Sequence, residues 1–194
     1  LAALPQKNFK RLLAYSSVGH SGFLLMALAS SPRVSVENPM SPTTVVAFYL
    51  GAYLLMTLLA FLVLSSVRSA IPGEEIDFYR GLAKRSPFHA AALLFAMASL
   101  AGIPLTAGFL GKVFAFKLAV DAGQWGLLAA ALVAAAAGFY YYLKIVVAMY
   151  FSEPAKGDES TIRVSPLTGF AMVVLMVLIV VVGVAPGVIV GLFS

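Results

Sequence analysis

Lysine and histidine side chains inside long apolar stretches are the groups of this sequence that could move a proton. Lys112 lies in such a stretch, and residues that disfavour a continuous helix stand just before it: Gly102, Pro104, Thr106 and Gly108. Proline has no N–H, and its ring clashes with a carbonyl of the preceding turn. Within a membrane, broken backbone is tolerated only where it is buried in protein or lines a cavity. A helix break beside an intramembrane lysine therefore predicts an ion or proton site.

Lys112 has two interpretations. A lysine near the end of a span can bury its stem while its ammonium reaches the headgroups, and this suits Lys117. It suits Lys112 less well, because the helix break comes immediately before it. A charge in the membrane costs roughly 2.5–3.5 kcal/mol on insertion scales, and burial disfavours the charged form. We therefore favour a Lys112 that gains and loses a proton near neutral pH.

Other polar groups in the apolar stretches carry weaker arguments. His20 is either a packed histidine that bonds a neighbouring helix or a titrating relay, since histidine changes charge near physiological pH. Lys144 follows a run of tyrosines, and a place on a proton path and an interfacial anchor are equally open for it. His89 is expected near the membrane surface, or at most at a channel entrance. Tyr49 and Tyr53 share one helix face and are expected to pack.

The composition is that of an integral membrane protein. The 194 residues are 61% hydrophobic and 11% charged, with a mean hydropathy of +0.97. The net charge of +5 is explained by loop lysines and arginines that set membrane orientation, rather than by nucleic-acid binding. The lack of cysteine excludes disulfides and thiolate metal sites, and His20 has no partner at metal-ligand spacing. No P-loop, haem or Fe–S pattern, Ser-His-Asp arrangement or dinucleotide fingerprint is present, so no catalytic or metal site is predicted.

The apolar stretches predict an all-α membrane bundle. A membrane helix needs roughly 20 mainly apolar residues. We expect a single membrane domain over 1–194 with spans at about 12–29, 43–67, 88–120, 125–151 and 167–193. As one helix the third span would be roughly 50 Å long, so it is expected to be discontinuous at residues 102–108. A short surface helix is expected within residues 76–82, and all acidic residues are placed in loops or turns.

Lysines and arginines gather in alternate loops. Lys7, Lys10 and Arg11 precede the first span. Arg68, Arg80, Lys84 and Arg85 lie between the second and third spans, and Lys156 and Arg163 lie between the fourth and fifth. The opposite side has only Arg33. By the positive-inside rule the basic loops are cytoplasmic. The N-terminus of this segment is then predicted to be cytoplasmic and the C-terminus outside.

Several stretches resemble the antiporter-like subunits of respiratory complex I, the proton-translocating NADH-quinone oxidoreductase. They read KNFKRLLAYSSVGHSGFLL, KRSPFHAAALLFAMASLAGIPLTAGFLGKVFAF and GFYYYLKIVVAMY. The resemblance covers nearly the whole chain, and SLAGIPLTAGFLGK is specific to the family. Members of the family have fourteen spans with two inverted five-helix repeats, each containing a discontinuous helix. The resemblance implies that this chain holds the last five spans, with the third as the discontinuous helix.

The resemblance also implies roles and partners. Lys112 matches the lysine of the discontinuous helix, which the family is thought to use in the outward proton path, and His20 matches a histidine of a preceding span. Together with Lys144, which we add from its place in the sequence, they would form a Lys/His relay driven by quinone reduction elsewhere in the enzyme. NADH, FMN, Fe–S clusters and quinone would be bound by other subunits, and no cofactor by this chain. The expected partners are other membrane subunits of complex I, including neighbouring antiporter-like subunits, in a bacterial inner membrane.

Part of the family's pattern lies outside this sequence. The glutamate and lysines of the first repeat would fall upstream of Leu1, and the second repeat lacks its first helix, so we expect a C-terminal part of a longer chain. Two other functions stay open. A subunit of a multisubunit sodium/proton antiporter shares the fold and the lysine helix, and a structural membrane subunit would use Lys112 only as an anchor.

Overall fold

The regular structure of this chain is helical throughout the part that can be described. The computed structural model describes residues 1–30, 41–68, 70–71, 73–154, 162 and 164–187. Its helices are α1 (Phe9–Ser30), α2 (Pro42–Val67), the 3-10 helix η2 (Ile76–Tyr79), α3 (Leu82–Arg85), α4 (Pro87–Ala101), α5 (Ala107–Asp121), α6 (Trp125–Phe151) and α7 (Pro166–Val184). Within these residues there is no β-strand, and the all-α prediction is confirmed.

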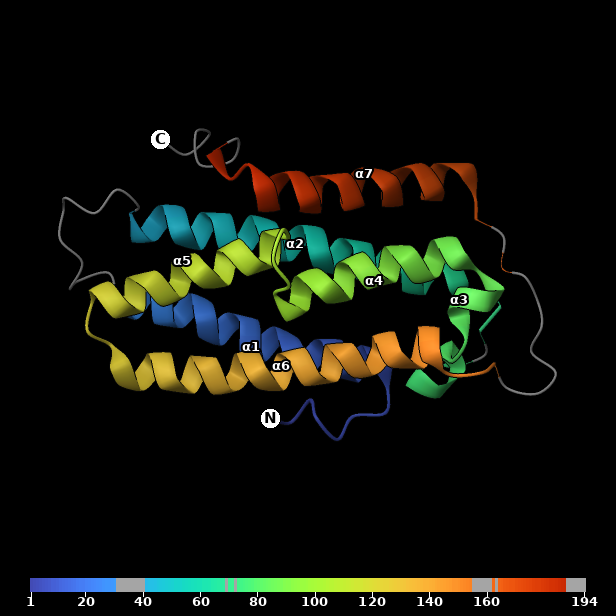
Figure 1. Cartoon of the computed structure of the whole chain (residues 1–194), viewed down its shortest axis with the longest axis horizontal. Coiled ribbons are helices and arrows are strands. Elements are labelled where there is room, and N and C mark those ends of the chain that lie inside the picture. Colours follow the sequence, from blue (N-terminus) through green and yellow to red (C-terminus); the bar gives the residue numbers. More distant parts are fainter. Residues whose placement is uncertain (31–40, 69, 72, 155–161, 163, 188–194) are drawn as a thin grey trace.

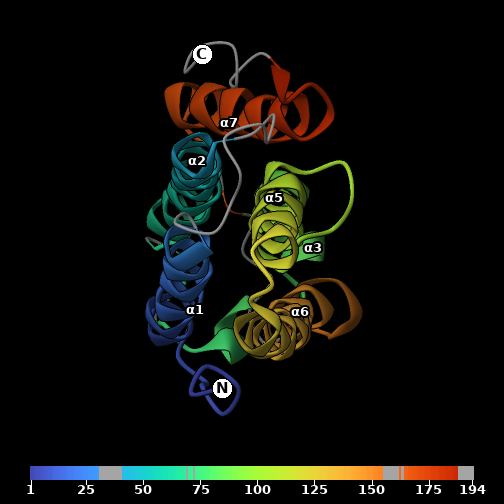
Figure 2. The same ribbon diagram turned by 90° about the vertical axis from the view of Figure 1, so that its left-hand side faces the viewer.

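The long helices run along one common axis. Of the described helices α1, α2, α6 and α7 are each long and apolar enough to cross a membrane, whereas α4 and α5 are shorter. Figure 1 shows α4 and α5 following one another along the axis, with residues 102–106 between them. In the end-on view of Figure 2, α7 lies at one edge of the bundle and α1 and α6 lie at the opposite edge, with α2 and α5 between them.

Helix ends follow from capping residues. α2 begins after Ser41, whose hydroxyl accepts the N–H of Thr44 at 3.1 Å, and Pro42 occupies the first turn. Proline also opens α4 and α7, where a missing N–H costs nothing. The surface helix expected within 76–82 is present as η2, with α3 directly after it.

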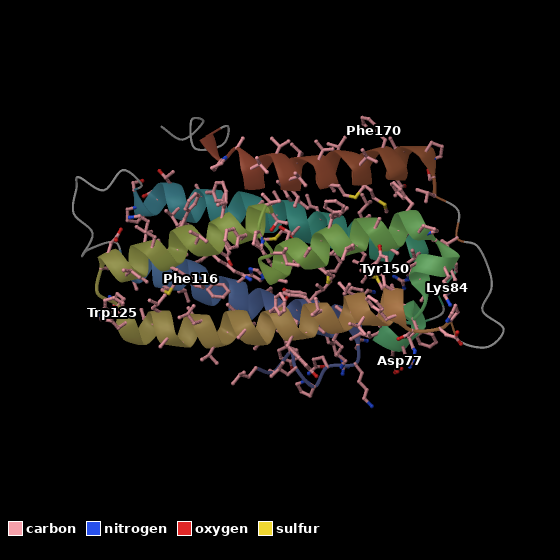
Figure 3. All side chains as sticks on the ribbon, viewed as in Figure 1. Asp77, Lys84, Phe116, Trp125, Tyr150 and Phe170 are labelled. Carbon is pink, nitrogen blue, oxygen red and sulfur yellow. The ribbon has the colours of Figure 1, made fainter. Side chains whose placement is uncertain are left out.

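The core is built around α4. Ala90, Ala92 and Ala96 on this helix are fully buried, and such small residues let the backbones of α2 and α6 approach closely. The outward faces carry large apolar side chains such as Phe170, which is 68% exposed. In Figure 3 Phe170 lies on the outer side of α7, Trp125 lies at one end of the bundle, and Asp77 and Lys84 lie at the other end. This distribution suits a bundle surrounded by lipid.

Some expected boundaries differ from the structure. Gly108 was expected within the helix break, but it lies in the first turn of α5, because its N–H is bonded by a side chain of α4. Asp121 was expected in a turn, but it is the last residue of α5 and accepts a bond from Lys117 at 2.9 Å, one helical turn earlier. The loop expected at 31–40 and the end of the fifth span at 188–193 lie outside the described residues.

Candidate functional site

The end of α4 is closed by a backbone motif. Gly102 has the left-handed conformation, with φ of 87°, which a residue with a Cβ rarely adopts. Its N–H donates to the Ser99 carbonyl at 3.0 Å, and the N–H of Ile103 donates to the Ala98 carbonyl at 2.9 Å. These are the bonds of a Schellman motif. Among the described residues no backbone N–H donates to the carbonyls of Leu100 and Ala101.

Lys112 binds those remaining carbonyls. Its Nζ donates to the Leu100 oxygen at 2.9 Å and to the Ala101 oxygen at 2.8 Å, and the residue is only 6% exposed. The carbonyl end of a helix carries a partial negative charge, so the ammonium stabilises the end of α4. No carboxylate within the described residues forms an ion pair with Lys112. Carbonyl dipoles therefore stabilise this buried charge in place of an anion.

Close backbone approach fixes Lys112 against α4. A Cβ at Gly102 would lie 3.1 Å from Nζ of Lys112, and a Cβ at Gly108 would overlap the carbonyl oxygen of Ser99. The Gly108 N–H donates to Oγ of Ser99 at 3.1 Å, so the start of α5 is bonded to the end of α4. Thr106 closes the connection by donating its hydroxyl to the Ile103 carbonyl at 2.6 Å. The two glycines thus allow the approach that Lys112 needs.

His20 connects α1 to α2 and α6. Its Nδ1 lies 2.9 Å from the hydroxyl of Tyr49, and its Nε2 lies 3.3 Å from the hydroxyl of Tyr142. The His20 ring also lies 4.7 Å from the ring of Tyr53, measured between centroids. His20 is 3% exposed, so both ring nitrogens are used inside the bundle. Hydroxyls can either donate or accept, so these tyrosines suit either protonation state of the imidazole.

A small cavity brings His20 and Lys112 to one place. Side chains from α1, α4, α5 and α6 line it, among them Ser16, Tyr141 and Tyr142. The space open to the centre of a water molecule is about 10 Å³, close to the least that holds one water. An ammonium has a third N–H donor beyond the two that the carbonyls take. The arrangement could therefore pass a proton between Lys112 and His20 through water.

The other candidate residues lie elsewhere. Lys144 is exposed on α6 and is not among the residues that line this cavity. His89 was expected near the membrane surface; it lies in the first turn of α4, and its side chain is fully buried among the helices. Its Nδ1 lies 2.6 Å from the Ser86 hydroxyl and its Nε2 lies 2.8 Å from the Ser66 hydroxyl. Within the described residues no group of His, Asp or Glu side chains could hold a metal ion.

Sequence reasoning missed Tyr142 as a partner of His20. From the sequence, the tyrosine run stands out only as the neighbour of Lys144. The spacing of Ala134, Gly138, Tyr141 and Tyr142 does place these residues on one helix face, and all of them line the cavity. That periodicity was the available signal. It gives the face that the side chains share, but not which helix that face meets.

Comparison with known proteins identifies the family. Residues 1–138 match the family described as "NADH:quinone oxidoreductase/Mrp antiporter, TM". The chain is 39% identical over 191 residues to NADH-quinone oxidoreductase subunit N of Chromohalobacter salexigens, covering 96% of this chain and 39% of that protein. It is 38% identical over 189 residues to NADH-quinone oxidoreductase subunit N 3 of Streptomyces griseus, covering 96% of this chain and 32% of that protein.

Solved structures agree with this assignment. A chain of respiratory complex I from Thermus thermophilus with bound Aureothin is 38% identical, with a TM-score of 0.81, and the match covers 98% of this chain and 41% of that chain. A chain of the Mrp complex from Dietzia sp. DQ12-45-1b shares the fold at 22% identity and a TM-score of 0.81, covering 97% of this chain and 42% of that chain. The chain spans about two fifths of the length of such relatives.

The resemblance inferred from the sequence is confirmed by these matches and by the helical fold. The apolar helices and the bacterial relatives make this a multi-pass protein of a bacterial membrane. The chain belongs to the family of membrane subunits shared by NADH:quinone oxidoreductases and Mrp antiporters.

Proposed function

We propose that this chain is part of a membrane subunit that translocates protons, coupled to quinone reduction elsewhere in an NADH-quinone oxidoreductase. The observation that carries the proposal is the position of Lys112, bonded to the open carbonyls of α4 and facing a cavity that it shares with His20. The relatives named NADH-quinone oxidoreductase subunit N support the assignment to this enzyme. In this proposal the chain has no redox site of its own and acts as a translocase component.

The bonds of Lys112 allow it to release a proton without leaving its place. A neutral amine keeps two N–H groups, so both carbonyls of α4 can stay bonded after the third proton leaves. The lone pair would then face the cavity and accept the next proton. His20 is the candidate for the group that exchanges this proton with Lys112, since it lines the same cavity. Lys112 would receive protons from the central axis of the subunit and release them toward the outer face.

The remainder of the path is also part of the proposal. Water would enter through the gap at residues 104–108, beside the break between α4 and α5. Lys144, which is exposed on α6, would act where α6 meets the rest of the longer subunit. Because the acids of the family's first repeat fall outside this sequence, Lys112 would respond to charges supplied by that part of the protein.

The membrane architecture completes the proposal. We propose that α4 and α5 together form one discontinuous span, so that five spans are present, as part of a longer inverted-repeat fold. The collinear arrangement of the two helices in Figure 1 supports this. The basic loops would face the cytoplasm, with the N-terminus of this segment inside and the C-terminus outside. Other membrane subunits, including neighbouring antiporter-like subunits, would be its partners, and NADH, FMN, Fe–S clusters and quinone would be bound by other subunits.

A second candidate function is cation/proton antiport. The shared fold with the Mrp complex of Dietzia supports it. The two functions differ in what drives transport, because antiport needs no quinone reduction. Proton movement that depends on NADH oxidation would favour the first function, and sodium-driven proton movement without NADH would favour the second.

The test of the proposed function is proton uptake driven by NADH in inverted membranes. The full subunit would carry Lys112→Met, which removes the charge, or Lys112→Arg, which keeps the donors for α4 but does not release a proton at working pH. We expect both variants to lose proton uptake, with assembly and quinone reductase followed in the same membranes. The matched control is Lys117→Met on the same helix, which is exposed and should stay within about twofold of the parent. Normal uptake in Lys112→Arg would overturn the proposed role.

A further inference from the structure

A polar pocket lies at the end of the bundle where α1 begins and α2 ends. It has a volume of about 210 Å³, and Lys10, Arg68, Glu74 and Tyr79 contribute its polar walls. The buried side chains of Leu64 and Ile71 form an apolar part of the wall. None of these residues belongs to the cavity shared by His20 and Lys112.

The pocket lies where two of the apolar helices end. Lys10 is in the first turn of α1, and Arg68 directly follows α2, so both stand where an apolar membrane helix ends. The neighbouring segment is fixed by backbone bonds from the Phe9 N–H to the Glu74 oxygen at 2.7 Å and from the Ile76 N–H to the Lys7 oxygen at 2.8 Å. The pocket is therefore a built feature of the fold, with polar and apolar side chains on its walls.

Charge in the pocket favours an anion. Glu74 already pairs with Lys10 and accepts a second bond from Asn8 at 3.4 Å. The hydrogen bond from Lys10 and that from Asn8, with the nearby charge of Arg68, hold the pKa of Glu74 below its usual value, so it is ionised at neutral pH. Arg68 makes no hydrogen bond or ion pair with another described residue. The pocket thus holds two cations, Lys10 and Arg68, and one anion, Glu74, and the guanidinium of Arg68 is available to bind an anion.

Tyr79 adds a neutral donor. The residue is buried to 3% exposure, yet within the described part of the chain its hydroxyl has no hydrogen-bond partner and is not fully enclosed. A phenol hydroxyl and a guanidinium on the walls of one pocket can bond the oxygens of a single phosphate group. A guanidinium fits phosphate better than an ammonium does, because its donors are planar and forked.

We propose that this pocket binds the phosphate of an anionic membrane phospholipid, held by Arg68 and Tyr79 with Lys10 beside it. The apolar wall at Leu64 and Ile71 would contact the adjoining glycerol and the start of the acyl chains. An anionic headgroup is favoured over a zwitterionic one, because Glu74 is occupied by Lys10 and Asn8 and offers little to a headgroup ammonium. A free phosphate ion would share the chemistry of the polar wall but not the contact with the apolar wall.

The test is photo-cross-linking of phosphatidylglycerol to the full subunit in its purified, delipidated complex. Labelling of peptides that cover residues 64–79 is titrated against lipid concentration. A basic side chain near the membrane surface adds about 1 kcal/mol to the binding of anionic lipid, so Arg68→Gln should weaken labelling about fivefold. Loss of one hydrogen bond in Tyr79→Phe should weaken labelling about threefold. The matched control Arg80→Gln changes an exposed arginine that does not line the pocket, and it should stay within about twofold.

Two further measurements in the same experiment identify the ligand. Glu74→Gln removes the anion of the pocket and should strengthen labelling by phosphatidylglycerol, whereas a site for a headgroup ammonium would be weakened. Inorganic phosphate and phosphatidylcholine are added as competitors, and neither should displace phosphatidylglycerol at equal concentration. Unchanged labelling in Arg68→Gln would overturn the proposal. So would displacement by inorganic phosphate at equal concentration, because the lipid would then contribute nothing beyond its phosphate.

Discussion

The two ends of α4 each hold a buried histidine or lysine cluster, but they are built differently. At the start of the helix His89 uses both ring nitrogens on the hydroxyls of Ser66 and Ser86. At its end, about 18 Å further along the helix axis, Lys112 binds backbone carbonyls and shares a cavity with His20. The first cluster is paired by side chains that do not titrate. The second combines two titratable groups with space for water, and only this second arrangement has the groups that the proposed proton transfer requires.

The largest expected effect is the loss of proton uptake when His20 is removed, with removal of His89 as the comparison. In the full subunit His20→Leu should reduce proton uptake per NADH oxidised by at least about tenfold, since it removes the partner of Lys112 in the cavity. His89→Leu should leave that ratio unchanged, although it should cost about 1–3 kcal/mol of stability by leaving buried hydroxyls unbonded. Proton uptake and the thermal unfolding midpoint are measured in the same preparations. Equal loss of uptake in both variants would contradict the distinction between the two ends.

The second effect concerns the backbone at the end of α4. Gly108→Ala places a Cβ against the Ser99 carbonyl, so the start of α5 must shift. Overpacking of this kind costs about 1–3 kcal/mol, and the shift would also move Lys112 from the carbonyls. Gly51→Ala on α2 is the matched control, because nothing lies within 4 Å of its added Cβ. The unfolding midpoint should fall for the first variant and stay level or rise for the second, since alanine favours a helix.

A smaller effect is expected from the hydroxyl that bonds His20. Tyr142→Phe removes the partner of Nε2 while keeping the packed ring. We expect proton uptake to fall by about threefold, because a net hydrogen bond contributes roughly 0.5–1.5 kcal/mol. Tyr140→Phe on the exposed side of α6 is the control. If both variants retain the uptake of the parent, Tyr142 only packs against His20.

The sequence predicted the helix break but not the bonds around it. Pro104 and Gly102 disrupt the backbone locally, so their effect is readable from residue types alone. The target of Lys112 is not, because the carbonyls of Leu100 and Ala101 become acceptors only once α4 ends and the first turns of α5 place the lysine against them. His89 shows a similar limit. Its place after a proline predicts the start of a helix, where it does lie, but not the partners that the packing of α2 against α4 provides.

The smallest effect lies in the connecting segment near the start of α4. Burial, and then the charge of Glu74, raise the pKa of Tyr79 from 10.0 to about 12. Since the unfolded chain ionises near 10 and the folded chain near 12, the stability that Tyr79 contributes is complete below pH 10. It should be lost as the pH rises from 10 to 12, because only the unfolded state releases the proton there.

The measurement for Tyr79 is the unfolding midpoint between pH 9 and pH 12, with Tyr79→Phe as the control. Phenylalanine keeps the edge contact with Phe9, whose ring centroid lies 5.1 Å away, but cannot ionise, so its midpoint should fall less steeply over that range. Parallel curves would mean that Tyr79 ionises equally in both states. A steeper parent curve would show that the hydroxyl stays protonated in the folded protein over a pH range in which the unfolded chain releases its proton. It would confirm that burial and the charge of Glu74 act on Tyr79 in the folded protein, whereas binding at the pocket is tested only by the lipid labelling.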